Sequence, residues 1–556
     1  MVHGVGTASA NALRPSRGYA AKGIVVAPQP TAAAVGADVL RAGGNAVDAA
    51  LAAGFVQGVV DPFMGGIGGF GSLIVHDAKT GQSTVVGYHG RAGSLARPDI
   101  FANQVLGQIH GHAERFSVKD GANQVGYKSI VVPGVPAGFA AAHQRFGRLP
   151  WATLLQPAIA LARDGVPVSG EVYDRWLEIP ETGHIGGLDR IKSNKECAAI
   201  FAPRGEYLLP GTLVRQPAYA NTLERLARAG AEDFYRGDIA RQIAKDMAAN
   251  GGLFTADDLA AYQPDIGPPV VGRYRGLDIH SLALPASGVQ LIELLNTLEH
   301  FDLRAIHATD RAQYIHVVAR AIQASFADRA CFMGDPRFLA VPVERLCSAE
   351  HGAELAELVR SERPIEVPGI GYREAMHTTH VCALDVDGNA VSLTHTLGSA
   401  SAVITPGLGF IYNNCMYQFH PYPGHPNSIA PGKSRLTGIC GTVVLKDGRP
   451  WLAVGALGGT RMQTAVLHTI LNIVDHGRSP IEAVEAPRFV AESAWLEMES
   501  RLGEFGPRLE AKGWRLRTSP RGYDLAFGLA FAALCHDDGS YLGGSDPRGG
   551  GGICFA

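Results

Sequence analysis

The sequence contains few charged residues and no long hydrophobic segment. Asp, Glu, Lys and Arg make up 18% of the 556 residues, against about 25% in an average soluble protein. The formal net charge of −3 leaves no basic excess for binding nucleic acid. The longest apolar stretch, residues 525–535, is shorter than the ~18 residues of a membrane-spanning helix. We therefore expect a globular protein that binds neither nucleic acid nor a membrane.

Paired cysteine motifs and a targeting segment are also lacking. The eight cysteines stand singly, with no CxxC pair among them. Scattered cysteines are typical of free thiols in a reducing compartment rather than of a disulfide framework. The first 23 residues contain no apolar stretch like that of a secretory signal. From these features we expect a cytoplasmic protein.

Helical patterns dominate the first two-thirds of the chain. Asn45 is placed to cap a helix that begins in the Ala-rich segment 43–55. Segments 136–147 and 150–165 each start with Pro and end with Gly, as helices commonly do. Apolar spacing predicts two more helices within 218–250 and another over 311–326.

The last third of the chain favours antiparallel strands. Asp387-Gly388, Asp447-Gly448 and Asp538-Gly539 each separate two apolar stretches, which is a strong signal for a β-hairpin. Residues 456–477 read as a helix beside the resulting sheet. A helix-rich first part and a hairpin-rich second part predict an α+β protein with a packed antiparallel sheet.

A glycine-rich segment, residues 66–71, fits the pattern GxGxxG of dinucleotide-binding loops. Such a loop needs a strand before it and a helix after it. Here Pro62 precedes the segment and a hairpin pattern follows it. We therefore favour a loop in which backbones pack closely, and keep nucleotide binding as a minor alternative.

Metal binding and a serine triad are weakly supported. His377, His380 and His395 lack the spacing of a known ligand set, and His377 and His380 would face opposite sides of a strand. No GxSxG sequence is present, although its absence does not exclude a Ser-His-Asp triad elsewhere. We expect ordinary core or surface histidines, and neither a metal nor an organic cofactor.

Threonines gather at one end of the first predicted hairpin. If Asp387-Gly388 is a two-residue turn, Thr379 lies opposite Thr396 and Thr378 lies within one residue of it. A longer turn would shift this pairing by one or two positions. Three hydroxyls would then meet at one edge of a sheet, although β-branched residues chosen for strand propensity remain the simpler interpretation.

At this point the sequence resembles the γ-glutamyltransferase family over almost its whole length. The matching blocks occur in the family's order: LRAGGNAVDAALAA, VDPFMGGIGGFG, VPGVPAGF, MAANGGLFTADDLAAY, RYRGL, ADRACFMGDPRF, TTHVCALDVDGNAVSLT, GALGGTR and GGSDPR. The resemblance implies an N-terminal-nucleophile hydrolase with a four-layer αββα sandwich. It also implies that the precursor cuts itself before Thr378, into segments 1–377 and 378–556, which stay associated as a heterodimer.

The catalytic residues that the resemblance implies are all present. Thr378 matches the nucleophile, and Thr396 matches the second threonine beside it, with Thr394 as a neighbour in the same motif. Gly458 and Gly459 match the pair whose backbone N–H groups form the oxyanion hole. Cleavage would free an α-amine with a pKa of about 7.7–8.0, which can accept the threonine proton.

The residues that would bind a γ-glutamyl group differ from the family. The arginine for the α-carboxylate becomes His89, with Arg91 as a substitute if the register slips. The other replacements, in chain order, are Gly398 for asparagine, Cys415 for Gln or Glu, Gln418 for aspartate, and Thr437-Gly438 for two serines. Each lost charged hydrogen bond weakens binding by roughly 1.5–3 kcal/mol. The lid segment after Phe419 is also short.

The sequence therefore predicts a self-processing threonine amidohydrolase or acyltransferase that acts on a small amide, with altered acyl specificity. Two alternatives remain. The first is a genuine γ-glutamyl transferase or glutathione hydrolase, and the second is a catalytically silent binding protein on the same scaffold.

Overall fold

The structure is a computed structural model that describes residues 19–108, 115–177, 183–368 and 378–556. Predicted features within residues 1–18, 109–114, 178–182 and 369–377, including His377, lie outside the described residues. Within the described ranges, no helix combines the length and the apolar character needed to cross a bilayer.

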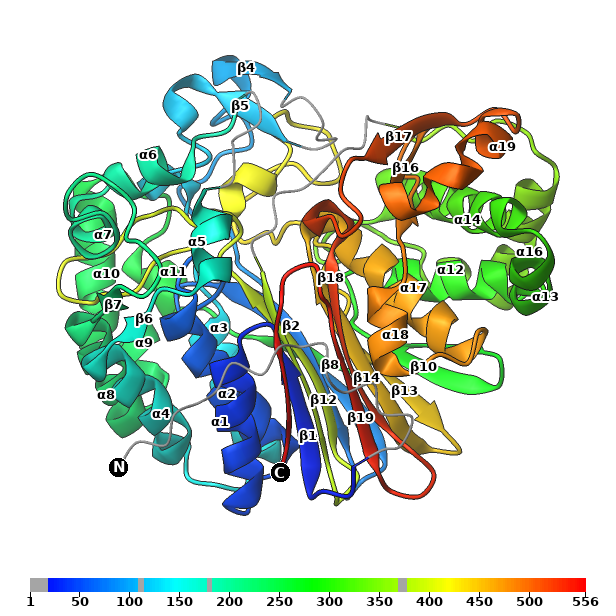
Figure 1. Cartoon of the computed structure of the whole chain (residues 1–556). Helices are drawn as coiled ribbons and strands as arrows, with labels where there is room; N and C mark the ends of the chain where they lie inside the picture. The colour runs from blue at the N-terminus through cyan, green and yellow to red at the C-terminus, as the bar shows by residue number, and fades with distance from the viewer. Residues whose placement is uncertain (1–18, 109–114, 178–182, 369–377) are drawn as a thin grey trace.

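Two antiparallel sheets stack face to face at the centre of the described chain (Figure 1). The first has seven strands in the order β20 (Gly552–Phe555), β1 (Gly23–Ala27), β11 (Thr379–Asp385), β12 (Ala390–Thr396), β2 (Phe70–Asp77), β3 (Gln82–Tyr88) and β8 (Asp265–Gly267). The second has six in the order β19 (Tyr541–Ser545), β18 (Leu529–Cys535), β14 (Arg449–Leu457), β13 (Thr442–Lys446), β10 (Leu277–Ser281) and β9 (Val270–Tyr274).

Helices cover the outer face of each sheet (Figure 1). On the side of the first sheet lie α1 (Pro30–Arg41), α2 (Ala46–Val60), α3 (Val135–Phe146), α4 (Trp151–Asp164), α8 (Pro217–Ala229), α9 (Glu232–Tyr235), α10 (Asp238–Ala249) and α11 (Ala256–Ala260). On the side of the second lie α12 (Gly288–Leu298), α13 (Leu303–Thr309), α14 (Arg311–Phe332), α15 (Val343–Leu346), α16 (Ala349–Arg360), α17 (Met462–Val474), α18 (Pro480–Glu485) and α19 (Gly506–Glu510). These layers form the predicted αββα sandwich.

Smaller elements flank the sandwich. They are α5 (Gly170–Trp176), α6 (Gly187–Lys192) and α7 (Lys195–Phe201), the strand pairs β4 (Val105–Gln108) with β5 (Phe116–Val118) and β6 (Val166–Pro167) with β7 (Leu213–Val214), and the sheet of β15 (Phe489–Val490), β16 (Trp495–Glu499) and β17 (Arg515–Ser519).

Strand alternation explains why the first sheet is buried on both faces. In β1, Ile24 and Val26 pack into the core shared with the second sheet, whereas Val25 and Ala27 pack into the core beneath α1 and α2. Successive side chains of a strand point to opposite faces, so each strand of this kind contributes to two cores. The helix signals also hold locally, since Asn45 caps α2 in a capping box with Asp48.

The segments before and after Thr378 interleave in both sheets. In the first sheet β11 pairs with β1, and β12 pairs with β2. In the second sheet β13 pairs with β10. Separating the two segments would break these ladders and expose both cores, so the architecture by itself holds them together.

The three predicted hairpins are present, but the strand register of the first differs by one position from the register that a two-residue turn would give. Thr379 pairs with His395 rather than with Thr396. The cause is Asp385, whose carboxylate accepts hydrogen bonds from the backbone and side-chain amides of Asn389 at 2.9 and 2.8 Å and so closes a longer turn. The shift of one position brings Thr378 opposite Thr396.

Two further sequence interpretations are corrected. The helix expected over 456–477 begins only at Met462, because Ala456 and Leu457 pair with β18 as the end of β14. The glycine-rich segment 66–71 leads into strand β2 rather than a helix. It therefore lacks the strand–loop–helix geometry of a dinucleotide site, and the alternative of close backbone packing is the one observed, with a Cβ at Gly68 falling 2.2 Å from the Ile411 carbonyl oxygen.

Candidate active site

The two threonine hydroxyls meet at the end of the central hairpin. Thr378 lies directly before β11 and Thr396 ends β12. The Thr378 hydroxyl donates to Thr396 Oγ1 at 3.1 Å, and the backbone N–H of Gly398 donates to the same oxygen at 2.9 Å. Both threonine side chains are almost fully buried. A hydroxyl held in this way is oriented before any substrate arrives.

Thr394 supports this pair from two positions before Thr396 on β12. Its hydroxyl pairs with His380 Nδ1 at 2.8 Å, and its carbonyl accepts a hydrogen bond from the Tyr88 hydroxyl at 3.0 Å. Complete burial lowers the pKa of His380 to about 3, so the imidazole is neutral at physiological pH. Thr394 therefore fixes the strand rather than adding a charge to the site.

Contacts between the two sheets bring the glycine pair to the same end. Ser392 Oγ donates to the Val454 carbonyl at 3.0 Å, and a Cβ at Gly455 would meet the His380 ring. β14 ends at Leu457, and Gly458 and Gly459 follow directly. Because Gly455 lies against His380, two residues after Thr378, the glycine pair reaches the end of the sandwich where Thr378 lies.

The glycine loop opens a helix. Gly458 adopts φ +129° and Gly459 φ +63°, values that favour glycine. They lead through a 3-10 turn into α17, and backbone N–H groups at such a start suit a developing negative charge.

Arg461 follows the glycine loop and is held in place by two ion pairs. The sequence analysis did not predict a role for it. Its buried guanidinium forms ion pairs with Glu492 at 3.0 Å and Glu497 at 3.1 Å. The only sequence signal is its place in the GALGGTR block. Since the two carboxylates come from residues distant in sequence, this role depends on tertiary structure.

The remaining predicted pocket residues lie around this centre. A Cβ at Gly398 would lie 2.5 Å from Asn414 Oδ1 and 3.9 Å from Gln418 Nε2. Cys415 and Gln418 bound one short 3-10 turn, and both are buried. Asn414, which the sequence analysis did not single out, accepts the Ser399 N–H at 2.8 Å and thereby holds the turn against the segment after Thr396.

Thr437 and Gly438 pack against the glycine loop. The Thr437 carbonyl accepts a hydrogen bond from Ser287 Oγ at 2.6 Å. A Cβ at Gly438 would fall 1.9 Å from the Gly459 carbonyl oxygen. No side chain fits at position 438 without displacing Gly459.

His89 and Arg91 differ sharply in their surroundings. His89 is buried directly after β3, and burial lowers the pKa of its imidazole to about 4. The Arg91 guanidinium forms an ion pair with Asp265 at 2.9 Å and lies 5.1 Å from the centre of the Tyr262 ring. This geometry therefore does not favour Arg91 as the replacement for the family's arginine.

Two groups of titratable residues lie outside this cluster of threonines and glycines. His380 and His395 lie on different faces of the hairpin, since His380 contacts Thr394 whereas His395 contacts Gln57 of α2. Among the described residues, Glu293, Asp328 and His351 form a group that could hold a metal ion. The hydrogen bonds that His351 donates to Asp328 and Glu293 raise its pKa to about 10, so this group is an internal ion pair at neutral pH rather than a set of free ligands.

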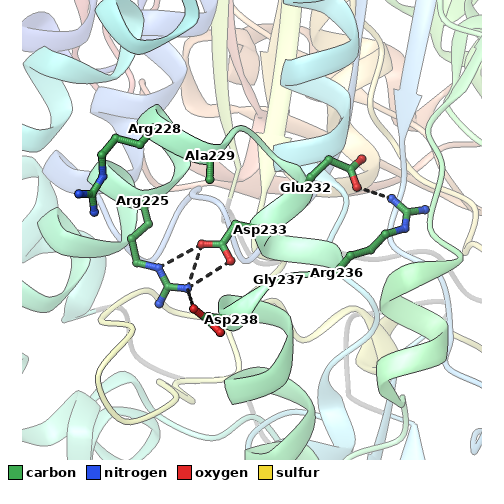
Figure 2. Close-up of a pocket in the computed structure, with 8 residues that line it drawn as sticks. All are labelled: Arg225, Arg228, Ala229, Glu232, Asp233, Arg236, Gly237 and Asp238. Atoms are coloured by element: carbon green, nitrogen blue, oxygen red, sulfur yellow. Dashed lines mark hydrogen bonds and ion pairs between the residues drawn. The ribbon is translucent and has the colours of Figure 1, made fainter.

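A surface hollow of about 550 Å³ lies between α8 and α10 (Figure 2). Two of its three arginines pair with carboxylates, Arg225 with Asp233 at 2.9 Å and Arg236 with Glu232 at 2.7 Å. None of the side chains that line it is a hydroxyl or thiol nucleophile. Its chemistry is that of a charged surface.

A four-layer sandwich that places a threonine hydroxyl at the start of a central strand defines the N-terminal-nucleophile hydrolases, enzymes that act on amide bonds. Comparison with known proteins places the chain within this class. The family model for gamma-glutamyltranspeptidase matches residues 32–556, and the chain belongs to that family.

Its relatives include enzymes with different names. The chain is 34% identical over 558 residues to the glutathione hydrolase proenzyme of Escherichia coli (strain K12), covering 95% of this chain and 91% of the relative. It is 37% identical over 537 residues to the acylase ACY 1 proenzyme of Pseudomonas sp. (strain V22), covering 95% and 92%. The crystal structure of cephalosporin acylase from Bacillus halodurans superposes with a TM-score of 0.84 at 27% identity and covers 100% of this chain and 99% of that one.

Proposed function

We propose that the chain is a self-processing threonine amidohydrolase that transfers a small acyl group other than γ-glutamyl to water or an amine. The observation that carries the proposal is the buried Thr378–Thr396 hydroxyl pair at 3.1 Å. The proenzyme names of the relatives support cleavage of the peptide bond before Thr378. The products, residues 1–377 and 378–556, would remain together as a heterodimer through their interleaved strands.

The proposed reaction needs only groups at this end of the sandwich. After cleavage, the Thr378 α-amine accepts the proton of Thr378 Oγ1 as that oxygen attacks the amide carbonyl. Backbone N–H groups of Gly458 and Gly459 stabilise the oxyanion. The tetrahedral intermediate collapses to an acyl-enzyme and expels the amine, which takes up the proton. Water or a second amine then attacks the ester while the α-amine takes up its proton. That proton passes to Thr378 Oγ1 as the acyl–oxygen bond breaks and the acid or new amide leaves.

Altered acyl specificity is supported by the groups that would face a γ-glutamyl donor. A buried, neutral His89 and the uncharged Gln418 replace the ion-pair partners of its α-carboxylate and α-ammonium. The alternative, γ-glutamyl hydrolysis, is favoured by the 34% identity to the glutathione hydrolase proenzyme.

The experiment has two steps. Intact-mass analysis with N-terminal sequencing should give two chains, the smaller beginning Thr378-Thr379-His380. Rates on γ-glutamyl-p-nitroanilide and on anilides of other short acids then separate the two activities. Robust turnover of the γ-glutamyl compound alone would overturn the altered specificity, whereas a permanently uncut and inactive chain would overturn the enzymatic proposal and favour a silent binding protein.

A further inference from the structure

We infer that Gln29 and Gln57 are positioning residues, which act through the start of β11 to hold the Thr378 hydroxyl in place. The inference rests on the proposed function, because it concerns the same nucleophile after the precursor has been cut. Both glutamines belong to the segment before the cut, and β11 belongs to the segment after it. Their contacts therefore join the two products of cleavage next to the new chain end.

The first residue pair of the central hairpin faces the glutamines. Thr379 pairs with His395 across β11 and β12, and paired residues direct their side chains to the same face of a sheet. Both side chains are fully buried, on the face that α2 covers. Thr378 and Thr396 are the neighbours of this pair along the chain, so their hydroxyls lie on the opposite face. The glutamines therefore support the sheet from behind the hydroxyl pair.

His395 fixes the direction of the hydrogen bonds. The backbone N–H of Gly66 donates to His395 Nδ1 at 3.2 Å, and burial lowers the pKa of this imidazole to about 3. The neutral ring therefore carries its proton on Nε2 and donates it to Gln57 Oε1 at 2.9 Å. With its oxygen facing His395, Gln57 presents its NH₂ group to the other side.

The side-chain amide of Gln57 binds both the main chain and Gln29. Its Nε2 donates to the His380 carbonyl at 2.9 Å and to Gln29 Oε1 at 2.8 Å. The Thr379 hydroxyl donates to the same Gln29 oxygen at 3.0 Å. The hydrogen bonds therefore form a closed path from His395 through both glutamines to Thr379, its partner across the two strands.

A buried carboxylate fixes the other end of this path. Gln29 Nε2 donates to Asp61 Oδ2 at 3.1 Å, and the same oxygen accepts a hydrogen bond from Arg175 Nη2 of α5 at 2.5 Å. Asp61 is only 1% exposed. Every bond direction is thus set between the Gly66 N–H and the Asp61 carboxylate. Neither glutamine can turn its amide over without placing a buried donor against a donor, which is costly.

Cleavage of the precursor increases the need for this support. In the precursor the backbone holds Thr378 from both sides, whereas in the processed enzyme only its bond to Thr379 remains. The hydroxyl and the new α-amine must meet a substrate carbonyl in a defined geometry, and an error of about 1 Å can cost about 10²-fold in rate. Because Gln29 and Gln57 lie behind the sheet, their loss should affect every amide substrate alike.

The test compares Thr379→Val with the wild type, using γ-glutamyl-, glutaryl- and butyryl-p-nitroanilide as probes. Valine keeps the shape of threonine, but its methyl group cannot donate to Gln29 or stay 3.0 Å from that oxygen. Gln29 Oε1 keeps the bond from Gln57, so no buried acceptor is left alone. On each probe that the wild type hydrolyses, kcat should fall about 10- to 100-fold while KM changes less than about threefold. Thr379→Ser, which keeps the hydroxyl, should recover most of the rate.

Thr442→Val is the matched control. Thr442 is also a fully buried threonine at the first position of a strand, β13, and its hydroxyl bonds to Ser281 Oγ at 2.9 Å. Ser281 Oγ retains the Gly441 carbonyl as a partner. The substitution therefore removes a comparable buried hydrogen bond from the second sheet. It should lower the unfolding temperature by a similar amount and leave kcat unchanged.

The kinetic outcomes decide the role of the two glutamines. An unchanged kcat in Thr379→Val, an equal loss in Thr442→Val, or a loss confined to KM for one acyl group would each overturn the positioning role and leave the amidase proposal standing. A folded Thr379→Val chain that stays uncut beside a normally cut Thr442→Val would show the same misplacement at the first step that uses the hydroxyl. Should Thr379→Val not fold, Thr379→Ala, which also lacks the hydroxyl, takes its place.

A second readout separates this inference from the proposed function. A wild type that is cut but hydrolyses none of the three probes would overturn the amidase proposal. Phenylmethanesulfonyl fluoride then tests positioning alone, because its sulfur bonds to the Thr378 oxygen and fluoride leaves. By intact mass of the 378–556 chain, this labelling should be about 10-fold slower in Thr379→Val than in the wild type. Equal labelling rates would overturn the positioning role, and a wild type that is neither active nor labelled would contradict both proposals.

Discussion

The catalytic end of the candidate site and its acyl-binding end follow the family to different degrees. Around Thr378 the residues are small, neutral and held by backbone contacts, and each family position is filled as the resemblance implies. Around His89 the positions that are charged in the family hold neutral side chains. The residues around Thr378 contact the atoms whose bonds form and break, so the reaction constrains them closely. The residues around His89 only have to match one acyl group. A family can therefore keep its chemistry and change its substrate.

The largest effect should come from removing the nucleophile. Thr378→Ala should abolish both cleavage of the precursor and amide hydrolysis, a loss on the order of 10⁴-fold or more, because no other described hydroxyl stands in its place. Thr378→Ser keeps the hydroxyl and should retain slower cleavage and measurable activity. Intact mass and anilide hydrolysis report the two effects. A Thr378→Ala chain that still separates into two pieces at this bond would contradict the assignment.

Much of the sandwich could be predicted from local chemistry. The capping of α2 by Asn45, and the hairpins at Asp447-Gly448 and Asp538-Gly539, depend on residues close in sequence. The first hairpin was displaced by one position because Asp385 binds Asn389 across the turn. A one-residue error is small in sequence, but it decides whether Thr378 or Thr379 faces Thr396.

The residue roles that the sequence did not predict depend on contacts between residues distant in sequence. The ion pairs of Arg461 with Glu492 and Glu497 span more than 30 residues. Such contacts are visible only after the sheets have been stacked.

The next largest effect should arise where the two ends meet, at Gly438. An added methyl group would fall 1.9 Å from the Gly459 carbonyl oxygen, so Gly438→Ala should displace the glycine loop. We expect kcat to fall by about 10²–10³, the cost of losing one oxyanion donor, with similar loss on charged and uncharged acyl groups.

Gly267→Ala provides the matched control, since a Cβ there meets nothing within 4 Å. It should leave the rates unchanged. If Gly438→Ala instead raises KM for one acyl anilide alone, position 438 belongs to the acyl-binding end rather than to the catalytic end.

The pH dependence of stability should separate the buried histidines of the catalytic end from His351. Burial lowers the pKa values of His380 and His395 to about 3, below the ordinary 6.5 of the unfolded chain. The unfolded state therefore takes up protons that the folded state excludes, and stability falls as the pH drops from 6.5 toward 3. The slope is up to ~1.4 kcal/mol per pH unit for each histidine.

His351 should show the opposite sign. The hydrogen bonds that His351 donates to Asp328 and Glu293 raise its pKa to about 10, so its stabilisation is complete below pH 6.5 and is lost as the pH rises toward 10. His351→Gln should lower the unfolding temperature at pH 6 more than at pH 10. Thermal unfolding of the wild type and of His351→Gln from pH 4 to 10 measures this difference. His300→Gln, at an exposed position, is the control. Equal destabilisation by His351→Gln at every pH would argue against a charged His351.

The smallest effect is expected at the charged hollow between α8 and α10 (Figure 2). Arg236 and Glu232 form an exposed pair one helical turn apart, with side chains 44% and 73% accessible. Such pairs contribute about 0.3–0.5 kcal/mol, so Arg236→Ala should shift stability within that range and leave every anilide rate unchanged. The contrast with Gly438→Ala is between an ion pair that water already solvates and a buried backbone contact at the glycine loop. A loss of activity in Arg236→Ala that is confined to negatively charged acyl anilides would mean that long-range charge contributes to the choice of acyl group.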